Sequence, residues 1–307
     1  MEGRPTLPPM SSTPLRTHDG PDGTGTPDRA PRAFGPAELD ELVASYRADG
    51  FAVLRGLLDA GDLDQLEREC TDAQSGLIAG RLDERHGTLE LIEGDAGDKA
   101  RRFANYVLRI TELSPAAHRA VHDPVVEDLV ARFHQGPCWS GRDDRFGFVY
   151  QDARPSPDSS YRRIGWHSDW QSGPHLKMWP STAVTVHIDG TSPANGYLRV
   201  VPGSHRWATP APWENVNGAV VPEGSAPWGG YGDEEPPFPM PLRFEEVPGE
   251  LALFAEPGDV LFHDCYLWHA AAEAADPGAR RRHVRGSWYA GERATYGPDD
   301  FVKNAAR

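Results

Sequence analysis

Three residues from two separated segments have the types and the spacing to bind a metal ion. His167 and Asp169 lie two positions apart in "GWHSDW" (165–170), and His269 ends the string "FHDCYLWH" about a hundred residues later. On an extended strand, residues i and i+2 project from the same face, so this imidazole and this carboxylate are expected to converge on one point. A histidine from another strand would complete a set of two histidines and one carboxylate.

This ligand set is the one that non-haem Fe(II) oxygenases use, because it leaves coordination positions open for oxygen and a co-substrate. We prefer His269 as the third ligand, since the small residues 270–272 that follow it leave room beside a metal. His263 lies six positions earlier in the same predicted strand, "VLFHDCYLWHA", and therefore on the same face. We interpret His263 as a structural histidine or as a support for a ligand.

The next segment, "ARRRHVRGSWYA" (279–290), carries four arginines in an acidic chain. A buried guanidinium can bind a carboxylate through two parallel hydrogen bonds. One of these arginines is therefore a candidate anchor for the far carboxylate of a dicarboxylate co-substrate. A solvated basic edge accounts for others, because not all four can point inward.

Bulk properties limit the partners and the compartment. The chain has 307 residues, 38% of them hydrophobic, with 32 Gly and 29 Pro, which is typical of a globular protein with many short strands and turns. A formal charge of −15 argues against nucleic acid and anionic membranes as partners. Three cysteines without a CxxC pair indicate reduced thiols and a cytoplasmic protein. We find neither a membrane-spanning apolar run nor a secretion signal.

The order of segments predicts a disordered tail followed by one domain. Residues 1–33 are rich in Pro, Gly, Thr and Ser, so they cannot bury enough surface to fold. Residues 34–307 begin with a helix, a strand and a helix, and continue from about 138 as short β-branched or aromatic runs. The Pro- and Gly-rich segment at about 207–248 is predicted to be a long loop or lid. The expected fold is mainly β with flanking helices, a double-stranded β-helix of the jelly-roll, cupin-like type.

Five strings in this order resemble the phytanoyl-CoA dioxygenase family of Fe(II)- and 2-oxoglutarate-dependent oxygenases. The resemblance covers nearly the whole chain after the tail, and "SPANGYLRVVPGSHRW" is its most specific string. The other strings are "YRADGFAVLRGLLDAGDLDQLERE", "WHSDW", "GDVLFHDCYLWHA" and "RRRHVRGSWY". Within the family, "HSD" followed by an aromatic residue is distantly similar to the ectoine hydroxylase branch. The substrate-contact run that typically follows in that branch is missing here, which indicates a different small molecule.

The resemblance implies that His167, Asp169 and His269 bind Fe(II). The family's co-substrate arginine corresponds to Arg280 by its distance from the distal histidine and to Arg282 by alignment on the end of the strand. Both positions have the same strand parity, whereas Arg281 would point away. Gln151 occupies a position at which the family often has a polar residue that binds the co-substrate.

The implied activity is hydroxylation of an unactivated C–H bond in a small molecule, an amino acid or a natural-product intermediate. The implied co-substrates are 2-oxoglutarate and O2, and succinate and CO2 are the co-products. Retention of Asp169 argues against halogenation, because related halogenases have a small residue there. Two alternatives stay open, a cupin-like enzyme with another metal such as zinc and a non-catalytic jelly-roll binding protein. A monomer or a homodimer is expected.

Overall fold

The computed structural model describes residues 31–87, 106–140, 146–149, 165–174, 178–211, 228–239, 243–276 and 278–293. The predicted tail, residues 1–33, lies almost wholly outside these ranges. Parts of the predicted loop, 212–227 and 240–242, also lie outside them. The first described element is the short strand β1, Ala33–Phe34, so order extends to the very end of the predicted tail.

Helices come early in the chain, as the sequence pattern predicts, and their ends follow local capping rules. The α-helices and 3-10 helices are α1 (Leu39–Asp49), α2 (Ala60–Ile78), η1 (Glu84–His86), α4 (Ile110–Leu113), α5 (Pro115–Val121), α6 (Pro124–His134), η2 (Asp169–Ser172) and η3 (Ser204–Arg206). Helix α1 ends at Gly50 in the left-handed region, with φ 83°, a conformation that suits glycine. The Asp59 carboxylate caps α2 by accepting a hydrogen bond from the Asp62 N–H.

Among the described residues, the strands form two main sheets and one short hairpin-like pair. The larger sheet has eight strands in the order β1-β2-β11-β6-β13-β5-β3, with β4 paired to β13; the smaller has the order β10-β7-β12, and β8 pairs with β9. Their bounds are β2 (Phe51–Leu54), β3 (Tyr106–Val107), β4 (Cys138–Ser140), β5 (Gly147–Val149), β6 (Ser181–His187), β7 (Leu198–Val200), β8 (Thr209–Pro210), β9 (Trp228–Gly229), β10 (Leu251–Leu253), β11 (Val260–Asp264), β12 (His269–Ala271) and β13 (His283–Ala290).

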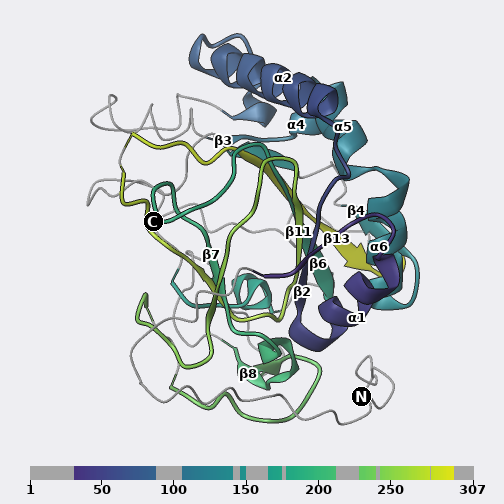
Figure 1. The fold of residues 1–307 in the computed structure, drawn as a ribbon, viewed down its shortest axis with the longest axis vertical. Helices are drawn as coiled ribbons and strands as arrows, with labels where there is room; N and C mark the ends of the chain where they lie inside the picture. The colour runs from purple at the N-terminus through teal and green to yellow at the C-terminus, as the bar shows by residue number, and fades with distance from the viewer. Residues whose placement is uncertain are drawn as a thin grey trace.

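The two sheets enclose a small apolar core, while the helices cover the outer face of the larger sheet (Figure 1). Side chains of Phe51, Val53 and Leu261 from the larger sheet pack with Val200 and Leu253 from the smaller one. Residues on the opposite face of the larger sheet belong to a second, larger core shared with the helices. Among them are Leu54, Val186, Phe262 and Val284. This two-sided burial confirms the predicted double-stranded β-helix with flanking helices.

The cysteines and the helices bear on two predictions made from the sequence. All three cysteines, Cys70, Cys138 and Cys265, have free thiols. Among the described residues, no helix combines the length and the apolar character that a membrane crossing requires.

A buried carboxyl group ties the end of β11 to distant parts of the chain. Asp264 is 1% exposed. Its Oδ2 accepts hydrogen bonds from the Tyr231 hydroxyl at 2.9 Å and the Tyr46 hydroxyl at 3.3 Å, and its Oδ1 accepts one from the Tyr266 N–H at 2.9 Å. Burial raises the pKa of Asp264 to about 7, against an ordinary value of about 3.9. Near neutral pH, this carboxyl therefore titrates in the folded protein.

We predict that Asp264 makes the protein less stable as the pH rises from about 4 to about 7. In that window the carboxyl keeps its proton in the folded state and has lost it in the unfolded chain, so the folded state binds more protons. The free energy of unfolding should decrease by on the order of a few kcal/mol across the window. Asp264→Asn mimics the protonated carboxyl and should remove this part of the decrease. Urea unfolding of both proteins at several pH values measures it, and parallel curves would contradict the prediction.

Candidate metal site

The two candidate histidine ligands face each other across a one-residue β-bridge. His167 and His269 pair in antiparallel fashion, the His167 N–H donating to the His269 carbonyl at 3.0 Å and the His269 N–H donating to the His167 carbonyl at 2.8 Å. Directly opposed residues of an antiparallel pair place their side chains on the same face. The ring centroids accordingly lie 4.3 Å apart. Main-chain pairing thus brings together residues about a hundred positions apart in the sequence.

Asp169 reaches the same point by a turn, and the prediction of one extended strand through His167 and Asp169 is wrong in this detail. Asp169 begins the 3-10 helix η2, which the preceding residue caps: the Ser168 N–H donates to the Gln171 side-chain oxygen at 3.1 Å, and the Gln171 N–H donates to the Ser168 carbonyl at 3.0 Å. The Trp170 N–H donates to the Cys265 carbonyl, which ties the helix to the turn after β11.

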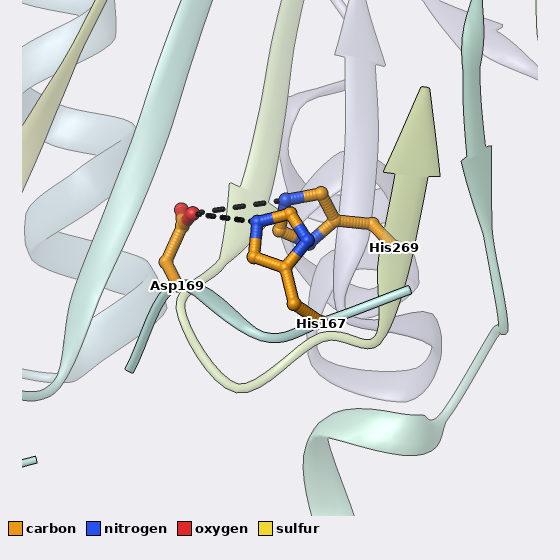
Figure 2. Close-up of side chains that lie close together, drawn as sticks. All are labelled: His167, Asp169 and His269. Carbon is orange, nitrogen blue, oxygen red and sulfur yellow. Dashed lines mark ion pairs between the residues drawn. The ribbon is translucent and has the colours of Figure 1, made fainter. Parts of the chain in front are cut away.

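Backbone carbonyls orient both imidazole rings. His167 Nδ1 lies 2.8 Å from the Gly165 carbonyl, and His269 Nδ1 lies 2.9 Å from the Leu267 carbonyl. A ring whose Nδ1–H donates to a carbonyl presents the lone pair of Nε2 to a metal. The two Nε2 atoms lie 3.8 and 3.7 Å from Asp169 Oδ1, and the ligand atoms of all three residues lie within 4.8 Å of one another. Figure 2 shows the three side chains pointing toward this common space.

The electrostatics favour the protonation states that bind a metal. Burial lowers the pKa of both His167 and His269, which keeps the imidazoles neutral. Burial alone would raise the pKa of Asp169, but the facing His263 and the neighbouring imidazoles of His269 and His167 outweigh this effect, and the pKa is lowered. Two neutral imidazoles and one carboxylate form a donor set that fits a divalent transition metal.

The strand predicted at 260–270 is two strands joined by a turn, and this corrects the placement of His263. Strand β11 ends at Asp264, whose carboxylate and carbonyl accept the Tyr266 and Leu267 N–H groups, and the chain then crosses to β12 in the smaller sheet. His263 nevertheless points into the same interior as His269, with ring centroids 4.7 Å apart, because the two sheets face each other. Its Nε2 lies 3.4 Å from Asp169 Oδ2.

The structure does not support the predicted arginine positions. Arg282 donates two hydrogen bonds to the Asp189 carboxylate and one to Glu67 of helix α2, so its guanidinium is held on the helical side of the sheet. Arg280 is exposed, whereas Arg281, predicted to point away, is 7% exposed. The parity argument was wrong because strand β13 begins only at His283. Gln151 lies outside the described residues.

Arg285 lies on strand β13 and is not among the co-substrate residues predicted from the sequence. On β13, Val284 and Trp288 belong to the core shared with the helices, so His283, Arg285 and Ser287 face the opposite way, into the barrel. Arg285 is directly opposite Thr185 of β6, and its charge acts on His167. The direction of the Arg285 side chain could be read from "HVRGSWY", in which apolar and polar residues alternate with a period of two.

Part of the predicted loop packs against the metal-site turn. Strand β9 pairs with β8, and a Cβ added at Gly229 would lie 2.4 Å from the Trp170 ring. The glycine therefore allows the backbone to lie directly on the indole that follows Asp169. Trp166 and Trp170 are both 3% exposed, and the Trp166 indole N–H donates to the Glu245 carbonyl at 2.8 Å. In this structure the two tryptophans that flank the motif are buried packing residues.

The chain is similar to known dioxygenases. The model of the phytanoyl-CoA dioxygenase (PhyH) family matches residues 46–282, which is well over half of the chain. Dioxygenase FUM3 of Gibberella moniliformis is 25% identical over 178 residues, 55% of this chain and 55% of that protein. Ectoine dioxygenase of Sphingopyxis alaskensis is 25% identical over 231 residues, 74% of this chain and 68% of that protein. The chain thus spans little more than half the length of FUM3.

Solved structures share the fold. The crystal structure of EctD from S. alaskensis with 2-oxoglutarate and 5-hydroxyectoine superposes with a TM-score of 0.56 at 18% identity, covering 94% of this chain and 83% of that one. The non-heme alpha ketoglutarate dependent epimerase SnoN from nogalamycin biosynthesis gives a TM-score of 0.53 at 19% identity, covering 83% and 84%. At such identities, the likeness shows the common double-stranded β-helix.

We predict that single alanine substitutions at His167, Asp169 or His269 abolish stoichiometric binding of Fe(II), because each removes one of three ligands. Anaerobic equilibrium dialysis with Fe(II) measures this. His118→Ala on helix α5 is the matched control and should bind like the wild type. Stoichiometric Fe(II) in any of the three site variants would show that the ligand assignment is wrong.

Proposed function

This chain belongs to the phytanoyl-CoA dioxygenase family, and from this premise we propose that it is an Fe(II)- and 2-oxoglutarate-dependent dioxygenase that hydroxylates a small molecule. The observation that carries the proposal is the convergence of His167, Asp169 and His269 within 4.8 Å. These residues would hold the metal, which when bound supplies the activation of O2 that no protein side chain can provide. The facial set leaves positions for a co-substrate and oxygen.

The protein's own groups orient the metal ligands, limit the access of water and bind the charged co-substrate. Main-chain pairing and the Nδ1 hydrogen bonds set the two imidazoles before any metal arrives, which limits the reorganisation that binding requires. The two histidines of the site are nearly fully buried, His167 being 6% and His269 4% exposed, while the Asp169 side chain is 23% exposed. A water-poor site strengthens the electrostatic contacts made within it and protects reactive species from side reactions.

We assign the co-substrate's far carboxylate to Arg285 in place of Arg280 or Arg282. Arg285 faces the barrel interior, is opposite the Thr185 hydroxyl, and is near enough to His167 to act on it electrostatically. A guanidinium with a neighbouring hydroxyl is suited to a carboxylate, through charge-assisted hydrogen bonds. Arg282 is already committed to Asp189 and Glu67.

We infer the class of substrate from the similar proteins. The similar proteins include a dioxygenase, an ectoine dioxygenase and a nogalamycin epimerase, so one iron-site architecture serves several small-molecule reactions. We propose an amino acid or a natural-product intermediate as the substrate. Hydroxylation is proposed over halogenation because Asp169 keeps the carboxylate at the site.

We predict that the purified protein converts 2-oxoglutarate to succinate even without substrate, and only with Fe(II) and O2 present. Succinate is measured by mass spectrometry, and a screen of amino acids and natural-product intermediates then seeks stimulation of this turnover. Gain of one oxygen in the stimulating compound is the expected product mass. Activity with Zn(II) instead of Fe(II) would favour a different metalloenzyme, and metal binding without any turnover would favour a binding protein.

We predict that Arg285→Gln weakens binding of 2-oxoglutarate to the anaerobic Fe(II) protein by roughly 30-fold or more, the loss expected for a buried charge pair of about 2 kcal/mol. Spectroscopic titration with 2-oxoglutarate measures the affinity. Arg280→Gln and Arg282→Gln test the two positions expected from the sequence and should change the affinity by less than about threefold. Weakening by either of these, with Arg285→Gln unaffected, would contradict our assignment.

A further inference from the structure

We propose that His263 is a positioning residue for the metal site, holding Asp169 Oδ2 so that Oδ1 alone is presented to the metal. This inference rests on the proposed function. No motif of the family resemblance assigns His263, and its position on β11 of the larger sheet sets it apart from the three ligands.

The carboxylate of Asp169 divides its two oxygen atoms between different partners. Oδ1 lies 3.8 Å from His167 Nε2 and 3.7 Å from His269 Nε2, in the space shared by the ligand atoms. Oδ2 lies on the other side, 3.4 Å from His263 Nε2. His263 does not belong to the group whose ligand atoms lie within 4.8 Å of one another. Its position is therefore beside the candidate ligands Asp169 and His269, outside the group itself.

The surroundings of His263 leave Asp169 as its natural hydrogen-bond partner. His263 is 4% exposed, and its neighbours across the sheet are Phe51 of β2 and Ala183 of β6, neither of which offers a polar side chain. Within the part of the chain that the structure describes, neither ring nitrogen has a hydrogen bond of ordinary geometry. A buried imidazole without partners is costly, and the 3.4 Å contact is only a little longer than a normal bond.

A hydrogen bond to Oδ2 has a specific consequence for the metal. A hydrogen bond to one carboxylate oxygen uses part of its acceptor capacity and so favours metal ligation through the other oxygen. One-oxygen ligation leaves more of the coordination shell to the co-substrate and O2. Hydrogen bonds to metal-binding carboxylates also fix their orientation, and their loss typically lowers metal affinity or activity by about 10–100-fold.

The test compares two substitutions that differ only in the hydrogen-bond donor. His263→Phe keeps a flat ring of similar size and removes the donor, whereas His263→Gln retains an amide N–H near the position of Nε2. We expect His263→Phe to weaken Fe(II) binding by about 10–100-fold and His263→Gln to stay within about threefold of the wild type. Anaerobic Fe(II) titration measures the affinity, and X-ray absorption of the Fe(II) protein counts the imidazole ligands.

The controls separate this inference from general damage and from failure of the proposed function. His134→Phe removes a partly buried imidazole that contacts Thr182 on the helical side, and should not change Fe(II) affinity. We expect two imidazoles on iron in both the wild type and His263→Gln. Unchanged affinity in His263→Phe, or a third imidazole in the wild type, would overturn the positioning role while leaving the proposed function intact. Absence of Fe(II) binding in the wild type would instead overturn the proposed function.

Discussion

The metal site depends on one piece of main-chain pairing, the bridge between His167 and His269. Two short hydrogen bonds, 2.8 and 3.0 Å, join a turn-rich segment to the edge of the smaller sheet. Because directly opposed residues share a face, this bridge alone decides that two distant histidines meet. The 3-10 turn at Asp169, the carbonyl contacts of the Nδ1 atoms and the packing of Trp170 act on a geometry that the bridge has already set. Backbone pairing is a robust basis for a metal site, since it does not rely on side-chain rotamers.

A second constraint is that every strand of the larger sheet has two differently used faces. Most residues facing the helices are apolar, and they supply the larger of the two cores. Residues facing the barrel include polar groups, among them His263 and Arg285. Strand parity therefore separates apolar packing from the polar interior on the same strands. Two arginines close together in the sequence have different surroundings, because Arg282 precedes β13 and Arg285 lies on it. Arg282 holds helix α2 and Asp189, while Arg285 faces the interior.

Two carboxyl groups, one in the site and one near it, have different neighbours. Asp169 is surrounded by imidazoles, and its pKa is lowered. Asp264, five residues from His269, is surrounded by hydroxyl and amide donors, and burial raises its pKa to about 7. The pKa values of the two carboxyl groups are thus shifted in opposite directions, that of Asp169 downward by its neighbouring imidazoles and that of Asp264 upward by burial. Tyr231 links Asp264 to the segment that also brings Gly229 onto Trp170, so the folding of that segment and of the site are physically connected.

Local patterns in the chain were enough to determine the helices, the β-rich body and the identity of the three candidate ligands. Capping residues such as Asp59, the left-handed end at Gly50 and the period-two runs act over a few residues, so they can be read without knowing the rest of the fold. Only the tertiary structure decided how these pieces face one another. The break between β11 and β12, the turn at Asp169 and the start of β13 at His283 each shift side-chain direction, and pattern alone does not locate such boundaries to one residue. A shift of one residue reverses a strand face, which is why the candidate ligands could be named from their types while the direction of each arginine could not.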